Sequence, residues 1–216
     1  PTDSNLQIIE YDAFADTIIE EIYFPKSLIE LKYGWRHDMI KLNKIVVSPL
    51  NKQFIFKDDK YLLGKTNINS DEFDVLLFVK KDIEEISLPS NLKIIESYSF
   101  SKSKIKRVFI PPTVTQINQA AFSYCENLEK VEIPKNSNLQ IIGGCAFICS
   151  KIEEIYIPPN VTKIWWSAFT NCRKLAKVDI PMNSNLQIIG GHAFSSTEIK
   201  EIFIPPTVTK IYEKAF

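Results

Sequence analysis

Several features that would point to a specific class of protein are scarce or absent in this chain of 216 residues. It has no net charge, because 26 basic residues balance 26 acidic ones, so no overall basic field favours nucleic acid as a partner. No apolar run approaches the roughly 18 residues of a membrane-spanning helix, which argues against direct membrane insertion by this segment. The first residues also lack the charged-then-apolar pattern of a secretory signal. What remains is a folded chain of ordinary composition.

Motifs for catalysis or metal binding are missing as well. No nucleophile elbow, phosphate loop or dinucleotide fingerprint occurs, so we expect neither an enzyme nor a bound cofactor. Asn67, Asn69 and Asp71 are spaced like the start of a calcium loop. However, Glu72 and Phe78 occupy the positions where that loop needs glycine and a bidentate carboxylate. We therefore expect no metal site.

The few histidines and cysteines do not suggest a zinc site either. The four cysteines include no C-x-x-C pair and have no histidine at zinc spacing. His192 occupies the repeat position that holds Cys145 one double unit earlier, which marks it as a structural residue. We favour free thiols that pack as small apolar groups, with a disulfide from Cys149 to Cys125 or Cys172 as the alternative. The redox compartment therefore stays open.

The sequence does contain a segment that occurs twice with few changes. The stretch from Pro112 to Phe147 returns from Pro159 to Phe194, 47 residues later, with Ala-Phe, Ile-Pro and Asn-Leu-Gln-Ile-Ile-Gly-Gly in matching places. Fixed-period self-similarity indicates a stack of like units that bury their apolar faces against one another. Only six glycines against 12 prolines suit short, regularly placed corners.

Each unit contains a six-residue segment, here called a hexad, whose first, fourth and sixth residues are apolar. The last three residues alternate as in a half-buried strand, and a proline follows closely and ends it. We expect the hexads to lie in parallel and in register, about 4.8 Å apart. The hexads are Ile19–Phe24, Leu42–Val47, Ile83–Leu88, Ile105–Ile110, Leu128–Ile133, Ile152–Ile157, Leu175–Ile180 and Ile199–Ile204.

Phenylalanines mark the units further. From Phe100 to Phe216 they recur at alternating intervals of 22 and 25 residues, so two unlike units alternate and the true period is 47. Large aromatic rings at fixed repeat positions are what the interior of a solenoid needs. We expect the rings to stack as an interior spine and not to bind a ligand.

The pattern Ile-Pro-x-x-Val-x-x-Ile-x-x-x-Ala-Phe-x-x-Cys-x-x-Leu is clearest at Ile110–Leu128 and Ile157–Leu175. It resembles the BspA-like leucine-rich repeats, the Treponema pallidum type, and the paired spacing resembles the trichomonad surface-protein expansion. The resemblance implies a repeat solenoid, a right-handed coil of mostly strand and loop with little helix and a parallel β-sheet on its concave face. In the better-known members it also implies a surface role in adhesion or host interaction.

The repeat divides the chain into three parts. Residues 1–49 are expected to form N-terminal repeat coils, the first of them incomplete, and residues 82–216 regular coils in 47-residue pairs, the last incomplete. Residues 50–81 do not follow the repeat and form an insert. The incomplete end coils lack caps, so self-association through the open ends is a further expectation.

The insert has its own pattern. Gln53–Phe56 and Tyr61–Leu63 flank a charged turn and predict a β-hairpin, and Asp71–Val79 predicts a short helix or strand that returns to the stack. An insertion in a repeat protein can add a binding loop, or it can form a flap that covers a distorted coil. We favour the flap.

The outward positions of the hexads are the best candidates for a binding face. Their third residues carry charges of mostly alternating sign, which favours stacking, and their fifth residues include aromatic rings, which are typical interface anchors. The rings can equally serve strand packing alone. The candidates on this concave face are Tyr23, Arg107, Phe109, Lys130, Glu132, Glu154, Tyr156, Lys177, Asp179 and Phe203.

These observations predict a non-catalytic binding module. We expect it to recognise a protein or a glycoconjugate at the cell surface or outside the cell. The alternative is an intracellular scaffold for cytoskeletal or signalling partners in the cytoplasm, which free cysteines and zero net charge suit equally well.

Overall fold

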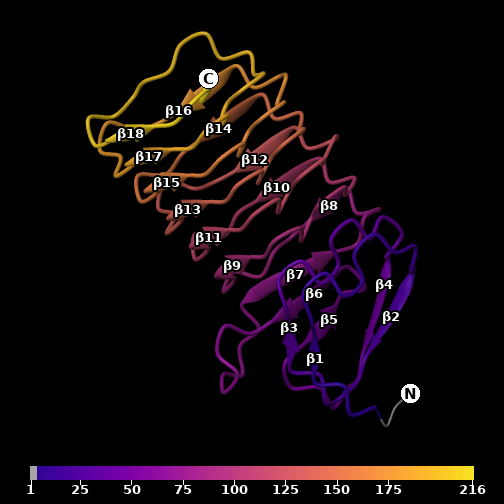
Figure 1. The fold of residues 1–216 in the computed structure, drawn as a ribbon. Helices are drawn as coiled ribbons and strands as arrows, with labels where there is room; N and C mark the ends of the chain where they lie inside the picture. Colours follow the sequence, from indigo (N-terminus) through magenta and orange to yellow (C-terminus); the bar gives the residue numbers. More distant parts are fainter. Residues whose placement is uncertain (1–3) are drawn as a thin grey trace.

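The structure, a computed structural model, describes residues 4–216 as a β-solenoid without helices in that range (Figure 1). The predicted repeat solenoid is therefore confirmed. The hexads form a first line of strands, each ended by the proline that follows it. These are β2 (Glu21–Phe24), β4 (Lys44–Val47), β8 (Glu85–Ile86), β10 (Arg107–Phe109), β12 (Lys130–Glu132), β14 (Glu154–Tyr156) and β16 (Lys177–Asp179).

A second line of two-residue strands runs along another side of the coils. These strands are β1 (Ile8–Ile9), β3 (Glu30–Leu31), β9 (Ile94–Ile95), β11 (Gln116–Ile117), β13 (Ile141–Ile142), β15 (Lys163–Ile164), β17 (Ile188–Ile189) and β18 (Lys210–Ile211). From β9 to β18 they pair in parallel without a break. This second sheet, and not the hexads, gives the longer stack its continuous hydrogen-bond ladder.

The third side of each coil in the longer stack is a turn that places one phenylalanine inside. The Phe122 amide donates to the Ala146 carbonyl (2.7 Å), and the equivalent bonds recur from coil to coil. The rings from Phe100 to Phe216 stack face to face, with centroids 4.4 to 5.6 Å apart, and all but the last are buried. The predicted interior spine is confirmed.

The hexad strands do not form one continuous sheet. They form three separate sheets, β2 with β4, β8 with β10 and β12, and β14 with β16, and the hexad Ile199–Ile204 contains no strand. Within residues 82–216, the unpaired neighbours are those whose prolines are 24 residues apart, whereas the paired ones are 22 or 23 apart. The extra residue lengthens the coil between two successive hexads, so the second hexad does not pair with the first. The single stack expected from the sequence was wrong at these points.

The insert forms β5 (Ile55–Lys57), β6 (Tyr61–Gly64) and β7 (Val75–Val79). These strands pair antiparallel with one another, and β7 then pairs in parallel with β9, so the insert extends the second sheet. Figure 1 shows them between the N-terminal coils and the longer stack.

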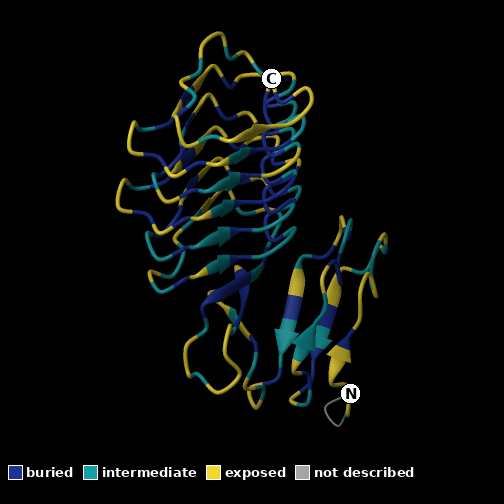
Figure 2. Ribbon diagram, turned by 60° about the vertical axis from the view of Figure 1, so that its left-hand side comes forward, coloured by how far each residue is buried: buried dark blue, intermediate teal, exposed yellow. Residues whose placement is uncertain are grey.

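Both faces of this inserted layer are covered. Leu62 and Phe78 pack into the core of the N-terminal coils, whereas Leu63 and Leu76 pack into the core of the longer stack. All four side chains are at least 98% buried, and Figure 2 shows buried strands at this junction. The insert therefore has the structural role that we favoured, but it is a buried layer shared by two cores and not a flap that covers one coil.

Candidate functional site

The predicted binding residues lie in in-register pairs on the outward face of the hexad strands, which we call the hexad face. Arg107 lies beside Lys130, and Phe109 beside Glu132, across β10 and β12. The hexad strands β14 and β16 repeat this arrangement with Glu154 beside Lys177 and Tyr156 beside Asp179.

A groove of about 410 Å³ crosses the hexad face where β12 and β14 are unpaired. The structure brings seven of the ten candidate residues together in its lining. They are Phe109, Lys130, Glu132, Glu154, Tyr156, Lys177 and Asp179. The groove therefore joins side chains from four strands, with one aromatic ring on either side of the break, Phe109 on β10 and Tyr156 on β14.

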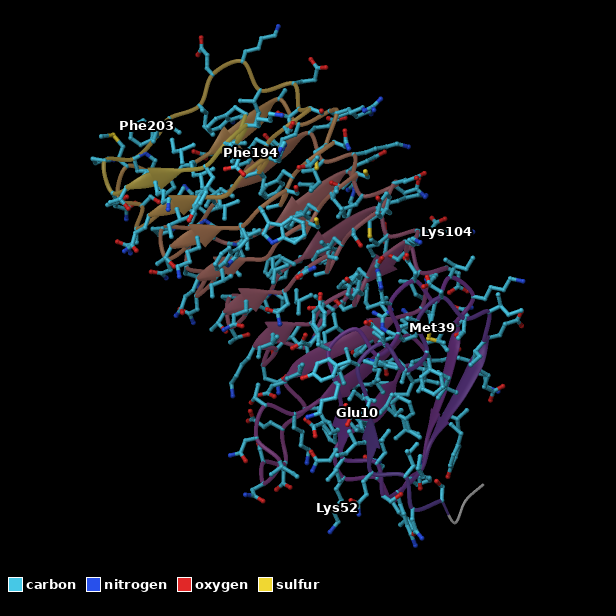
Figure 3. All side chains as sticks on the ribbon, viewed as in Figure 1. Glu10, Met39, Lys52, Lys104, Phe194 and Phe203 are labelled. Atoms are coloured by element: carbon cyan, nitrogen blue, oxygen red, sulfur yellow. The ribbon has the colours of Figure 1, made fainter. Side chains whose placement is uncertain are left out.

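Three candidates lie elsewhere. Arg107 lines an adjacent hollow, of about 440 Å³, together with Phe109 and Glu132. Tyr23 is half-buried on β2, in the separate N-terminal sheet. Phe203 lies beyond the last paired hexad strand, near the C-terminal end of the stack (Figure 3), and is 43% exposed.

Charges in the groove are loosely paired. The Lys130 ammonium lies 3.0 Å from the Glu132 carboxylate of its own strand, and Lys177 lies 4.0 Å from Glu154 across strands. Exposed pairs of this kind contribute at most about 1 kcal/mol, so a ligand can replace them at little cost. Burial and then the nearby Asp179 raise the pKa of Tyr156, which keeps its phenol protonated and able to donate.

The break also interrupts the backbone pairing of the hexad face. The Ile157 amide donates towards β16 and the Lys130 amide towards β10. Because amides alternate in direction along a strand, those of Val131 and Tyr156 point into the break. Within residues 4–216 no strand pairing joins β12 to β14. The two strands remain neighbours, with Cα atoms within 8 Å of one another, so a ligand meets the break from the outward face of the coils.

Cysteines offer little chemistry. All four are free thiols, and Cys125 and Cys172 are buried with their sulfurs 3.1 Å from the carbonyl oxygens of Phe100 and Phe147. Burial raises the pKa of both thiols to about 11, so they are protonated at neutral pH and unreactive. Among the described residues no three histidine, cysteine or carboxylate side chains gather as metal ligands. The same residues include no helix long and apolar enough to cross a membrane.

One group of exposed aromatic residues was missed by the sequence reasoning. Trp165, Trp166 and Tyr212 lie at the end of the second-sheet strands, and each is more than 40% exposed. The sequence does contain a signal for this group, because Trp165-Trp166 occupies the repeat positions where the flanking longer units carry Gly-Gly. It was overlooked because only the hexads were searched for outward rings.

Short parallel strands, a proline after each hexad and an interior phenylalanine spine define the class of protein as a leucine-rich repeat solenoid. The chain belongs to the family of the BspA type leucine rich repeat region, whose model matches residues 2–73, 71–184 and 137–216 in six copies. No curated protein sequence matches the chain significantly.

Solved structures show the same fold. The pneumococcal vaccine antigen PcpA is similar at a TM-score of 0.79 and 23% identity, covering 99% of this chain and 50% of its own. A leucine rich cell surface protein from Faecalibacterium prausnitzii gives 0.76 and 22%, covering 95% and 51%. A leucine-rich repeat protein from Eubacterium ventriosum gives a TM-score of 0.63 and 20% identity, covering 97% of this chain and 61% of its own. The chain thus spans about half the length of the first two, and the resemblance to trichomonad proteins stays a prediction.

Proposed function

We propose that this chain is a non-catalytic recognition module of a cell-surface protein, and that it binds an extended segment of a protein ligand in the hexad-face groove. The observation that carries the proposal is the groove at the β12–β14 break, where aromatic rings and weakly paired charges converge. Interfaces are anchored by such exposed rings and completed by a polar rim.

The surface location rests on weaker support. Two proteins of the same fold are described as a vaccine antigen and as a cell surface protein. Antibody labelling of intact source cells tests this part directly. Labelling that needs permeabilised cells would contradict it.

The binding site is tested with peptides selected from a random phage-displayed library against the folded chain. The double variant Phe109→Ala/Tyr156→Ala should weaken binding of the selected peptides at least tenfold, since truncating an anchor ring typically costs about 2 kcal/mol or more. Phe203→Ala is the matched control, because Phe203 is the repeat equivalent outside the groove. An equal loss of binding in the control, or no loss of binding in the double variant, would show that the groove is not the binding site.

An intracellular scaffold is the second candidate, and one observation favours it. All four cysteines are free, which suits a reducing compartment. Mass spectrometry of protein alkylated inside its source cells distinguishes the two. Oxidised Cys145 or Cys149, the two thiols that are only half-buried, would favour the cell surface, and four reduced thiols would favour the scaffold.

A further inference from the structure

A second surface, away from the hexad face, has the features of a ligand site. Trp165 and Tyr212 are both 41% exposed, and neither packs into the phenylalanine spine or the two cores. They are repeat equivalents, 47 residues apart, and each follows directly after a strand of the second sheet, β15 or β18. Each ring therefore presents a large part of its surface to solvent.

A lysine accompanies each ring. The Lys163 ammonium lies over the Trp165 ring, 5.5 Å from its centroid, and the Lys210 ammonium lies over Tyr212 at 4.3 Å. Neither lysine forms an ion pair with any carboxylate in the described part of the chain. Glu213 follows Tyr212 directly and its side chain approaches Gly191. The surface therefore presents two rings and two uncompensated positive charges.

The spacing between the two ring-and-lysine pairs is set by the coils. One strand, β17, lies between β15 and β18, so the pairs are two strand spacings apart, about 10 Å. The coil between them contributes Gly190 at the ring position, so no side chain of that residue stands between the two rings. A ligand can therefore contact both rings at once.

We propose that this surface, made of Lys163, Trp165, Lys210 and Tyr212, binds an acidic glycan. The C–H face of a pyranose ring is apolar and stacks on an aromatic ring, and its carboxylate or sulfate groups pair with the lysines. Two stacking positions on a fixed pitch suit a polymer of linked sugar rings, because engaging one ring raises the effective concentration of the next sugar at the other. The proposed groove on the hexad face is not needed for this site.

An acidic peptide is the competing occupant, and the sheet disfavours it. Within the described residues β18 pairs only with β17, so its free edge lies beyond Tyr212 and not between the two rings, and β15 and β17 are hydrogen-bonded on both sides within the ladder. Between the two rings a peptide therefore finds no free backbone edge. A glycan needs no such edge because it binds through ring faces and charges.

The test is a titration of the chain with hyaluronan and heparin oligosaccharides, followed by tryptophan fluorescence. Trp35 is 5% exposed, so a change on binding reports Trp165 or Trp166. We expect saturable binding of one or both acidic glycans that weakens as salt is raised. Neutral dextran and polyglutamate should not bind comparably.

Variants locate the site. Trp165→Ala/Tyr212→Ala should weaken glycan binding at least tenfold, and Lys163→Gln/Lys210→Gln should weaken it and flatten its salt dependence. Phe109→Ala/Tyr156→Ala, on the hexad face, should leave it unchanged, which separates this site from the proposed protein-binding groove. Circular dichroism checks that each variant folds. No saturable binding, equal binding of polyglutamate, or unchanged binding by the ring variant would each overturn the proposal.

Discussion

Single residues at the junction of the N-terminal coils and the longer stack combine burial with charge. Arg36 is 4% exposed, and its guanidinium donates to the carbonyl oxygens of Leu77 (3.3 Å) and Tyr98. Lys102 forms an ion pair with Asp38 across the same junction at 2.7 Å. The polar groups of Arg36 thus connect the N-terminal coils both to the inserted layer and to the first coil beyond it.

Lys81 gives this junction a dependence on pH. Burial, and then the cations of Arg36 and Lys102, lower the pKa of Lys81 to about 8 from 10.5 in spite of Asp38. Between these pH values the unfolded chain binds more protons than the folded one, so the free energy of unfolding rises with pH. The rise from Lys81 is about 1 kcal/mol between pH 7 and pH 9.

Urea unfolding at pH 7, 8 and 9 measures this rise. The variant Lys81→Met keeps the length of the side chain and should lose the contribution. The raised pKa values of the Cys125, Cys145 and Cys172 thiols act in the opposite direction as the pH approaches 9, so the difference between the two proteins at each pH, and not the rise in either alone, measures the contribution of Lys81. An equal rise in the variant would show that Lys81 is not its source.

At the scale of the structural element, the phenylalanine spine is the main packing device. Phe147 stacks between Phe122 and Phe169 at 5.0 and 5.2 Å and is fully buried. Phe147→Ala should lower the free energy of unfolding by about 3–5 kcal/mol. The control Phe203→Ala, at an exposed ring, should change it by less than about 1 kcal/mol. Chemical denaturation of both variants decides whether the spine or the outer rings hold the coils.

The Gly-Gly pairs provide a second element-scale prediction. A β-carbon on Gly190 would lie 2.5 Å from the Trp165 carbonyl carbon, whereas one on Gly191 would meet only Glu213, at 3.2 Å or more. Gly190→Ala must therefore push two coils apart, and it should cost about 1–3 kcal/mol. Gly191→Ala should cost less, because the Glu213 side chain can move. Similar melting temperatures for the two variants would contradict this difference.

Much of the repeat could be predicted from the sequence, whereas the second sheet and the breaks between hexads could not, for physical reasons. The hexads, the spine and the 47-residue pairing follow from local periodicity, which acts on side chains a few residues apart. The second sheet could not be read in the same way, because its strands of two residues, such as β11 and β13, are too short to show an alternation. The breaks between hexads depend on one extra residue in a loop.

The candidate site could be predicted only in part, because the repeat determines which residues share a face but not where the strand pairing breaks. In-register stacking places Phe109, Glu132, Tyr156 and Asp179 on one face, and this follows from the repeat alone. The groove that joins them depends on the β12–β14 break, and no single unit contains that information. Trp165 is a different case, because its exposure depends on which side of the coil faces solvent.

At the scale of the whole molecule, the inserted layer decides whether the chain behaves as one body. Tyr61-Leu62-Leu63 is a continuous apolar run, as expected for a strand buried on both faces. Since its side chains contribute to both cores, the N-terminal coils and the longer stack should unfold together. Neither core is complete without the layer.

This coupling is measured with Trp165→Phe/Trp166→Phe, which leaves Trp35 as the only tryptophan, in the N-terminal core. Unfolding followed by Trp35 fluorescence should coincide with unfolding followed by circular dichroism, which is dominated by the longer stack. Adding Leu62→Ala should lower both midpoints together, at a cost of about 2–5 kcal/mol. Two separate transitions would show that the layer does not couple the cores.

The central claim is that the break in the hexad face is a binding site, and hydrogen exchange of single amides followed by NMR tests it most directly. In the free chain the unpaired Val131 and Tyr156 amides should exchange rapidly, whereas the Ile157 amide, bonded to Asp179, should be protected. A bound, library-selected peptide should slow exchange at Val131 and Tyr156 and leave Ile157 unchanged. Protection confined to other faces, with rapid exchange retained at Val131 and Tyr156, would contradict the account.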